Sequence, residues 1–346
     1  MKKTLFAALA LVSMASCSNE EVLEVAQKEA IGFENAFVNN STRSAYDPSI
    51  TIDGDNELAD FAVYAYVENN ILFNGTTVDK TTKNNDLTNT ETVWKYAGTQ
   101  YWIAGAKYNF HAIAPKTGAN WTVGENGATR NNVTVSFNND GNQDLLYAKT
   151  DEIEGQASGN GLVGFTFNHA LSKVKFSFKN NYDASNAKIM IKDVKILDAY
   201  ATGTAVFTKN VTWNATSDNA TLDLDFGHAI ANDGEANNAF ASSFGDEIET
   251  YKELLLIPYP IADGYKVQFK VELYIGETTT PVRIYTHNVT IPAAKFTPVA
   301  GSAYDIMAVI APENIDPEHT QQPIEFTVTR IDDWGNTNNI DDILKK

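Results

Sequence analysis

Apolar and polar residues alternate with a period of two along most of the chain. The segment Lys173–Lys179 (KVKFSFK) places Val174, Phe176 and Phe178 on one side and its lysines and serine on the other. Because successive side chains of a β-strand point to opposite faces of a sheet, this pattern predicts strands with one buried face. Similar runs recur at residues 61–67, 108–114, 132–137, 188–197, 221–227, 265–275, 283–291, 303–310 and 324–331.

Clusters of Asn, Asp, Gly and Thr separate these runs, as in TIDGDNE and NNDGNQD. Such clusters indicate turns, and no long amphipathic helix interrupts the pattern. The pattern therefore predicts an all-β chain built from β-sandwiches. A turn at NHAL, directly after Phe167, predicts an N-terminal domain over residues 29–168 and a C-terminal domain over residues 169–346.

The first residues follow a different pattern. Lys2 and Lys3 precede an uncharged, largely apolar run that ends at Ser16. At about 13 residues the run is too short to cross a bilayer as a helix. Small residues then precede Cys17, the only cysteine of the 346-residue chain. A charged start, a short apolar run and small residues before a cut site are typical of an export signal.

Met14-Ala15-Ser16-Cys17 resembles a lipobox, the site where signal peptidase cuts before a cysteine whose sulfur is acylated. The resemblance implies that residues 1–16 are a lipoprotein signal peptide, that Cys17 carries the lipid and that residues 17–28 form a tether. Two or more acyl chains anchor a protein stably, at roughly 0.8 kcal/mol per buried methylene. With its thiol acylated the chain has no disulfide, so its stability depends on a hydrophobic core. Glu20 and Glu21 fit either a surface-export tag or a solvated tether.

The charge and the motifs argue against several classes of function. The formal net charge is −18, and it becomes −20 once Lys2 and Lys3 leave with the signal. So acidic a chain is a poor partner for nucleic acid. No nucleophile elbow, phosphate loop or zinc-binding helix occurs in the sequence. We therefore predict no enzyme, no catalytic residue, no metal site and no cofactor. Five histidines share no ligand spacing: His111, His169, His228, His287 and His319.

Two weaker signals have ordinary explanations. Asp223 and Asp225 lie two residues apart on a predicted strand, roughly 6.6 Å, which is within the span of an inverting glycosidase pair. Any exposed strand face with two acids has the same spacing. Asp53–Glu57 and Asp140–Asp144 resemble calcium loops faintly, but neither continues to a glutamate at the required offset, so we predict turns.

The chain contains DFAVYAYV, FTFNHALSKVKFSF and the closing VTRIDDWGN, among several segments of this kind. In order and spacing these segments resemble the fimbrillin family, whose members are lipoprotein-derived subunits of type V pili. The most specific are FNHALSKVKF and the terminal Asp-Trp-Gly, and the resemblance covers essentially the whole mature chain. It implies two tandem transthyretin-like β-sandwich domains and a place on the outer membrane surface or in a fimbrium. Other pilus subunits are the implied partners, besides the outer membrane itself through the lipid on Cys17. The remaining matching segments are VWKYAGTQYWIAGAKYNFHAIAP, DLLYAKT, ELLLIPYP and FTPVAGSAYDIMAVI.

The resemblance also implies how subunits assemble. A protease specific for Arg or Lys cuts in a loop after the first strand, and a terminal strand of another subunit fills the groove that remains. Residues 29–43 match the removable strand and its cleavage loop, with Ile31, Phe33 and Phe37 expected on one face. Cleavage after Arg43, the only Arg or Lys between residues 28 and 80, would start the mature subunit at residue 44, which is Ser44.

Residues 324–334 (IEFTVTRIDDW) match the donor strand, with Ile324, Phe326 and Val328 as its groove-filling residues. Strand addition combines a generic backbone ladder with side-chain pockets that give specificity. Each large apolar side chain buried in this way would contribute roughly 1.5–3 kcal/mol.

Three classes of function stay open on the sequence alone. The first is a structural subunit, stalk or tip, of an adhesive pilus. The second is a surface lipoprotein that never polymerises, either a monomeric adhesin for host protein or glycan or a pilus anchor that keeps its lipid. The third is an enzyme such as a glycan hydrolase, for which the sequence holds no recognisable constellation.

Overall fold

The computed structural model describes residues 29–38, 50, 57–84, 90–118, 120–181, 187–215, 221–231, 253–276, 278–315 and 324–331. Within these ranges the chain forms twenty β-strands and one four-residue helix, α1 (Pro312–Ile315). The all-β prediction is confirmed. No helix in the described ranges is long and apolar enough to cross a bilayer. Cys17, Arg43 and Ser44 lie outside these ranges, so the predictions about them stay predictions.

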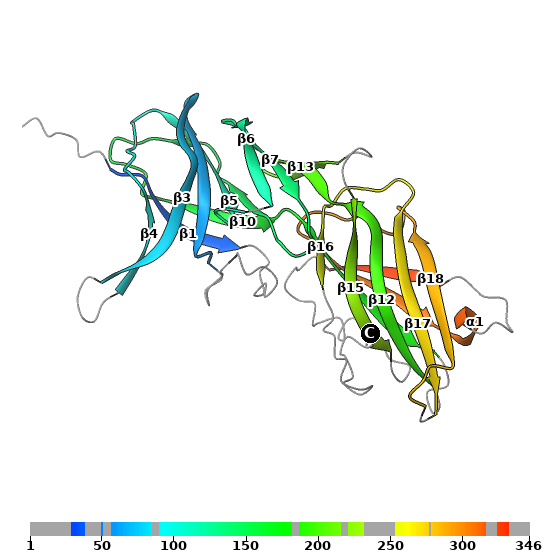
Figure 1. Cartoon of the computed structure of the whole chain (residues 1–346). Helices are drawn as coiled ribbons and strands as arrows, with labels where there is room; N and C mark the ends of the chain where they lie inside the picture. Colours follow the sequence, from blue (N-terminus) through cyan, green and yellow to red (C-terminus); the bar gives the residue numbers. More distant parts are fainter. Residues whose placement is uncertain are drawn as a thin grey trace, which may run out of the picture.

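The N-terminal part of the chain is a curled sheet (Figure 1). Phe33 on its first strand and Tyr96 on its last lie with ring centroids 5.6 Å apart, so the sheet nearly closes on itself. Its inner face encloses one hydrophobic core. β9 (Ile153–Glu154) pairs with β5 beside the main path. The strand order is β1 (Gly32–Val38), β10 (Leu162–His169), β8 (Leu146–Lys149), β5 (Lys107–Ala114), β2 (Asp60–Val67), β3 (Asn70–Asn84) and β4 (Thr90–Tyr96).

The central strands of this sheet are buried on both faces. On β2, Phe61 and Val63 face the inner core, whereas Ala62 and Tyr64 face a second core on the outer side. A four-stranded sheet covers the second core. This double burial explains why the β2 sequence FAVYAYV is apolar at every position instead of alternating. The covering sheet has the order β14 (Val211–Asn214), β13 (Thr202–Phe207), β7 (Val133–Asn138) and β6 (Trp121–Ala128).

The covering sheet contains strands from both sides of the predicted domain boundary. β6 and β7 precede residue 168, whereas β13 and β14 follow it. β13 pairs with β7 along its whole length, from Thr202↔Asn138 to Phe207↔Val133. The C-terminal half of the chain thus supplies the β13–β14 hairpin to the N-terminal core. A boundary at residue 168 separates this hairpin from the strand β7 with which it pairs.

The C-terminal part is a sandwich of two four-stranded sheets (Figure 1). Their facing sides form the largest core, which includes Phe176, Phe178 and Phe269. One sheet has the order β16 (Leu254–Leu256), β11 (Ser172–Asn180), β19 (Ala303–Ile310) and β20 (Phe326–Ile331). The other has the order β15 (Thr221–Ala231), β12 (Ala187–Tyr200), β17 (Tyr265–Ile275) and β18 (Arg283–Ile291).

The lysine side of β11 is buried, although the sequence predicts a solvent-facing side. Lys173 is 7% exposed, and its Nζ lies 3.2 Å from a carboxylate oxygen of Glu253. Ser177 Oγ donates a hydrogen bond of 2.8 Å to Asp305, and burial raises the pKa of that carboxyl group. Buried charges need partners of this kind, because an isolated charge away from water is costly. The alternating pattern therefore predicted this strand correctly, but it did not predict that both faces of the strand are buried.

Candidate functional site

β1 pairs with one strand along one edge, and the segment makes two isolated backbone hydrogen bonds on the other side. On one edge it pairs in parallel with β10 over its whole length. On the other, the Ile31 N–H donates to the Gln100 carbonyl (2.8 Å), and the Ala36 carbonyl accepts from the Leu58 N–H (3.0 Å). β1 therefore ends the strand order of its sheet, and these two contacts partly cover its outer edge.

Phe33 of β1 lies at the centre of the inner core and is 2% exposed. Its ring centroid lies 5.6–6.2 Å from five others, which belong to five different strands of the sheet. Aromatic pairs at such distances add stabilisation beyond their buried area. Without β1, these rings would line an open slot. They belong to Phe61, Phe73, Tyr96, Phe110 and Phe165.

The predicted inward face of β1 is wrong at one position. Ile31 and Phe33 point into the core as predicted, with exposed fractions of 1% and 2%. Phe37, predicted on the same face, is 41% exposed. The alternation therefore keeps the predicted phase only in the first half of β1 and continues with the opposite phase after it.

A β-bulge causes this change of face. Asn35 has a φ of 50°, and the pairing with β10 shifts register between Glu34 and Ala36. One extra residue in a strand reverses which later side chains point inward. Ala36 and Val38 therefore enter the core in place of Phe37. The only local indication of the bulge in the sequence is Asn35 itself, since asparagine adopts positive φ more readily than most residues.

β20, the predicted donor strand, is packed in its own sandwich. It pairs antiparallel with β19 and with no other strand in the described part of the chain. Ile324 and Phe326 are buried, and Val328 is partly buried against the same core. The three residues therefore share an inward face, as the sequence predicts. The ring of Phe326 lies within 6.4 Å of those of Phe176, Phe178 and Phe269.

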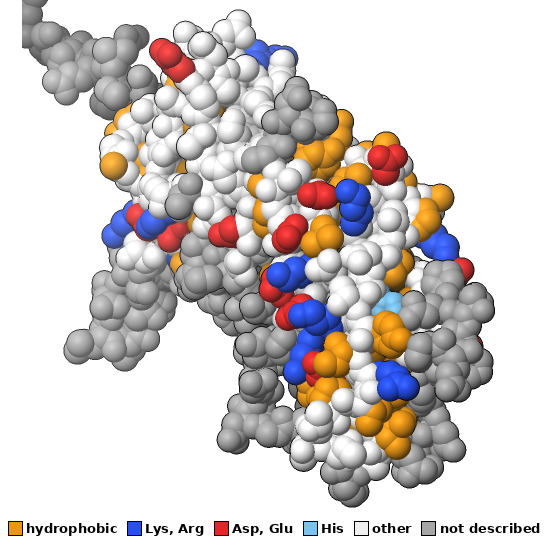
Figure 2. All heavy atoms as spheres, turned by 45° about the vertical axis from the view of Figure 1, so that its right-hand side comes forward, with side chains coloured by type: hydrophobic (Ala, Val, Ile, Leu, Met, Phe, Trp, Pro, Cys, Tyr) orange, Lys and Arg blue, Asp and Glu red, His pale blue; other side chains and the backbone are white. Residues whose placement is uncertain are grey.

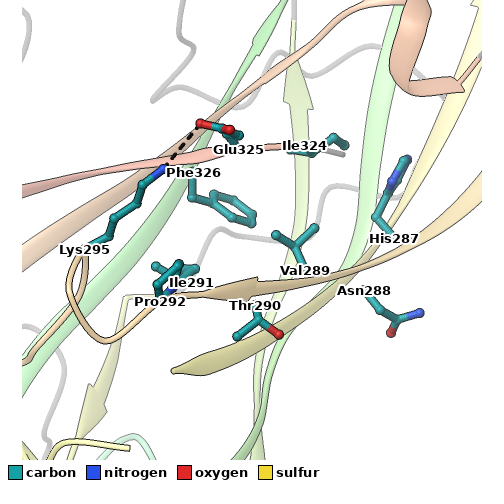
Figure 3. A pocket seen from close by; sticks show the side chains of 10 residues that line it. All are labelled: His287, Asn288, Val289, Thr290, Ile291, Pro292, Lys295, Ile324, Glu325 and Phe326. Carbon is teal, nitrogen blue, oxygen red and sulfur yellow. Dashed lines mark hydrogen bonds and ion pairs between the residues drawn. The ribbon is translucent and has the colours of Figure 1, made fainter. Parts of the chain in front are cut away.

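A cavity of about 330 Å³ lies between β20 and β18, the edge strand of the facing sheet (Figure 3). Val289 lines it from β18 and Phe326 from β20. Lys295 Nζ lies 3.3 Å from a carboxylate oxygen of Glu325, and these side chains are 50% and 80% exposed. The pocket opens to solvent beside the start of β20, while Ile324 and Phe326 are only 2% and 4% exposed.

Acidic groups that resembled sites are used in local structure. Asp140 accepts hydrogen bonds from the Asn142 and Gln143 N–H groups, so the segment is a turn, as predicted. Burial acts to raise the pKa of Asp140, but its several hydrogen bonds together hold the pKa below its usual value. Asp223 and Asp225 are exposed and accept backbone N–H groups, at 3.3 Å and 2.9 Å. The Asp53–Glu57 segment lies outside the described residues except for its last residue.

The described histidines do not come together. His111 is buried, and desolvation lowers its pKa to about 4, so it is neutral at pH 7. His169 contacts an aspartate in the core, and His287 stacks on a phenylalanine of the C-terminal sandwich. The side chains of His228 and His319 are not among those described. Across the described residues, no group of three or more His, Cys, Asp or Glu is placed to hold a metal ion.

Exposed apolar side chains occur near the end of the β17–β18 hairpin. Ile275, Val282 and Ile284 are 48%, 40% and 56% exposed. Figure 2 shows hydrophobic side chains beside lysines and acids on this side of the C-terminal sandwich. In the β17–β18 register Ile284 lies opposite Glu272, whereas Ile275 is in line with Leu273 on the other face, so the three side chains do not form one patch.

Comparisons with known proteins identify a family and similar folds. A family model described as fimbrillin-like matches residues 42–334. The fold is similar to that of a fimbrial protein from Bacteroides vulgatus, with 18% identity, a TM-score of 0.53 and coverage of 87% of this chain and 98% of that one. A candidate cell adhesion protein from Bacteroides uniformis has 15% identity and a TM-score of 0.48, with coverage of 89% and 99%. No curated protein matches the chain.

Proposed function

Because the chain belongs to the fimbrillin-like family, we propose that it is a structural subunit of a cell-surface pilus, exported as a lipoprotein and assembled by strand exchange. The family and the shared fold support a pilus or adhesion role. The observation that carries the mechanism is β1, an early strand whose buried Ile31 and Phe33 close the N-terminal sheet. The predicted cleavage site, Arg43, follows this strand by five residues.

Loss of β1 would leave a slot that favours a replacement strand. Burial of Ile31, Phe33 and Val38 contributes roughly 1.5–3 kcal/mol for each side chain. The edge of β10 would also lose its ladder partner, and an unpaired strand edge is a template for another chain. In this mechanism the incoming strand comes from residues 324–334 of another subunit.

Cleavage after Arg43 is expected to start assembly. Incubating purified precursor with an Arg-specific protease should yield a chain that begins at Ser44. A ladder of polymers should follow on an unheated denaturing gel, because the inserted strand is held by a backbone ladder and buried side chains. N-terminal sequencing and the gel measure the two results. The Arg43→Ala precursor is the control and should stay uncut and monomeric. Cleavage at this position without any ladder, even with partner subunits present, contradicts the mechanism.

The lipid on Cys17 has a separate test. In cells grown with a palmitate analogue, the wild-type precursor should become labelled and partition with the outer membrane. Cys17→Ala should abolish the labelling, because no other thiol exists in the chain. Labelling that persists in this variant would refute lipidation at Cys17.

A monomeric surface adhesin is the second candidate function. The exposed Val282 and Ile284 favour it, because a contact through these apolar side chains needs no polymerisation. An anchor that keeps its lipid belongs to the same alternative. A protein that stays monomeric after β1 is removed, and that binds host protein or glycan as a monomer, would support this function over the first.

A further inference from the structure

β1 and the segment that leads into β20 bury the same pair of side chains. Ile31 and Phe33 are separated by one residue, and so are Ile324 and Phe326. All four are buried, with exposed fractions of 1%, 2%, 2% and 4%. In both places the phenylalanine ring lies among other aromatic rings. The two segments are therefore matched in residue type, order and spacing.

Resting on the strand exchange proposed above, we propose a specific register and direction for it. Phe326 of a second copy of this chain takes the place of Phe33, and Ile324 takes the place of Ile31. The donor strand runs parallel to β10, as β1 does. The partner at the slot is therefore a second copy of this chain, aligned by one Ile-x-Phe pair.

The direction follows from the order of the pockets. Because β1 is parallel to β10, the slot presents the isoleucine pocket first and the phenylalanine pocket second along β10. Ile324 precedes Phe326 in the donor, so only a parallel donor fills both pockets with matching side chains. An antiparallel donor with Phe326 in the same pocket puts the smaller Val328 where Ile31 lies.

The side chains between the pair also fit this register. Glu325 falls at the position of Gly32, where a Cβ would come 2.5 Å from Cδ2 of Leu162. This clash involves the end of a flexible side chain that is 54% exposed, so a rotation of Leu162 relieves it. Thr327 falls at the outward position of Glu34, opposite Gly164. The Ile-x-Phe pair therefore sets the register without a backbone obstacle.

β20 is an edge strand of its own sheet. Within the described part of the chain it pairs with β19 alone, and the open pocket of about 330 Å³ lies beside Phe326 and the two residues before it. Its Lys295–Glu325 ion pair is largely exposed, and such pairs hold little energy. The slot of β1 offers a ladder along β10, two further backbone hydrogen bonds and a closed core. Transfer therefore exchanges the ladder with β19 for one of similar length with β10 and adds the two further hydrogen bonds.

Engineered cysteines test this register directly. Cys17 is the only native cysteine and leaves with β1, so the cleaved chain has a cysteine-free background. Gly32 lies opposite Leu162, and the proposed register therefore places Glu325 of the donor opposite Leu162. Directly opposed Cβ atoms on neighbouring strands are close enough for a disulfide. The test variant carries Leu162→Cys and Glu325→Cys, and β1 is released by cleavage at Arg43 or at a protease site inserted there.

The matched control carries Leu162→Cys and Thr327→Cys. With Phe326 in the same pocket, reversing the strand exchanges the positions of residues 325 and 327. The first variant should form a disulfide between subunits in every ladder band and none in uncleaved precursor, as read by mass spectrometry of the linked peptides. The control pair should stay reduced.

The outcomes separate the register from strand exchange itself. A ladder linked through the Thr327→Cys pair, or through neither pair, overturns the register and leaves strand exchange standing. A cleaved chain that forms no ladder contradicts the proposed function instead. In that case a synthetic peptide of residues 322–334 carrying Glu325→Cys or Thr327→Cys, added to the cleaved Leu162→Cys chain, decides the register. Linkage through the Glu325→Cys peptide supports it, and any other result overturns it.

Discussion

Replacing Phe33 with alanine is expected to lower the free energy of unfolding by about 3–5 kcal/mol, the usual cost of truncating a fully buried phenylalanine. The ring is 2% exposed and contacts rings from five other strands, so the cavity cannot be filled by one neighbour moving. Urea denaturation followed by tryptophan fluorescence measures the loss. Trp94 and Trp102 belong to the same core and report on it.

Phe37→Ala is the matched control, because it removes the same side chain from the same strand. Phe37 is 41% exposed after the bulge, so its truncation should change stability by roughly 0.5 kcal/mol or slightly more. Equal losses at the two positions would contradict the bulge at Asn35 and restore the simple alternation predicted for this strand.

Asp144→Ala is expected to have the second large effect. Asp144 Oδ2 lies 2.6 Å from His169 Nδ1, and the two side chains are 1% and 2% exposed. Asp144 Oδ1 also accepts the Leu145 N–H at 2.8 Å. Removing the carboxylate takes away both of these buried hydrogen bonds, at a cost of about 1–3 kcal/mol for each group that loses its partner. Thermal and urea unfolding measure the change.

An exposed ion pair supplies the control for this prediction. Lys266 and Asp198 lie 3.0 Å apart with side chains 59% and 60% exposed. Lys266→Ala should cost less than about 1 kcal/mol, since water screens such pairs. Asp144→Asn keeps a hydrogen-bonding side chain of the same size and should fall between the two. A loss for Asp144→Ala no larger than that for Lys266→Ala would show that the buried pair is not a major source of stability.

Local pattern predicted most of the strands because half-burial imposes alternation directly on the sequence. It also predicted the inward positions of Ile31, Phe33, Ile324 and Phe326, which lie in regular stretches. It failed at Phe37 because one residue in a positive-φ conformation reverses the face, and no apolar pattern encodes that reversal.

Pairing between distant strands was beyond the local pattern. β7 and β13 join in one sheet, yet β8 to β12 separate them along the chain. Alternation indicates that a strand has a buried face without naming its partner, because the same pattern fits many neighbours. The parallel pairing of β1 with β10 and the cavity beside β20 depend on such partners, so the geometry of the candidate site came only from the structure.

The sheet of β6, β7, β13 and β14 gives this chain a mechanical character. The N-terminal and C-terminal halves of the chain are joined by a continuous hydrogen-bond ladder between β7 and β13, in addition to the covalent connection. A force that separates the two halves of the chain would act on several of those hydrogen bonds. We therefore expect the connection between the two halves of the chain to extend little under tension.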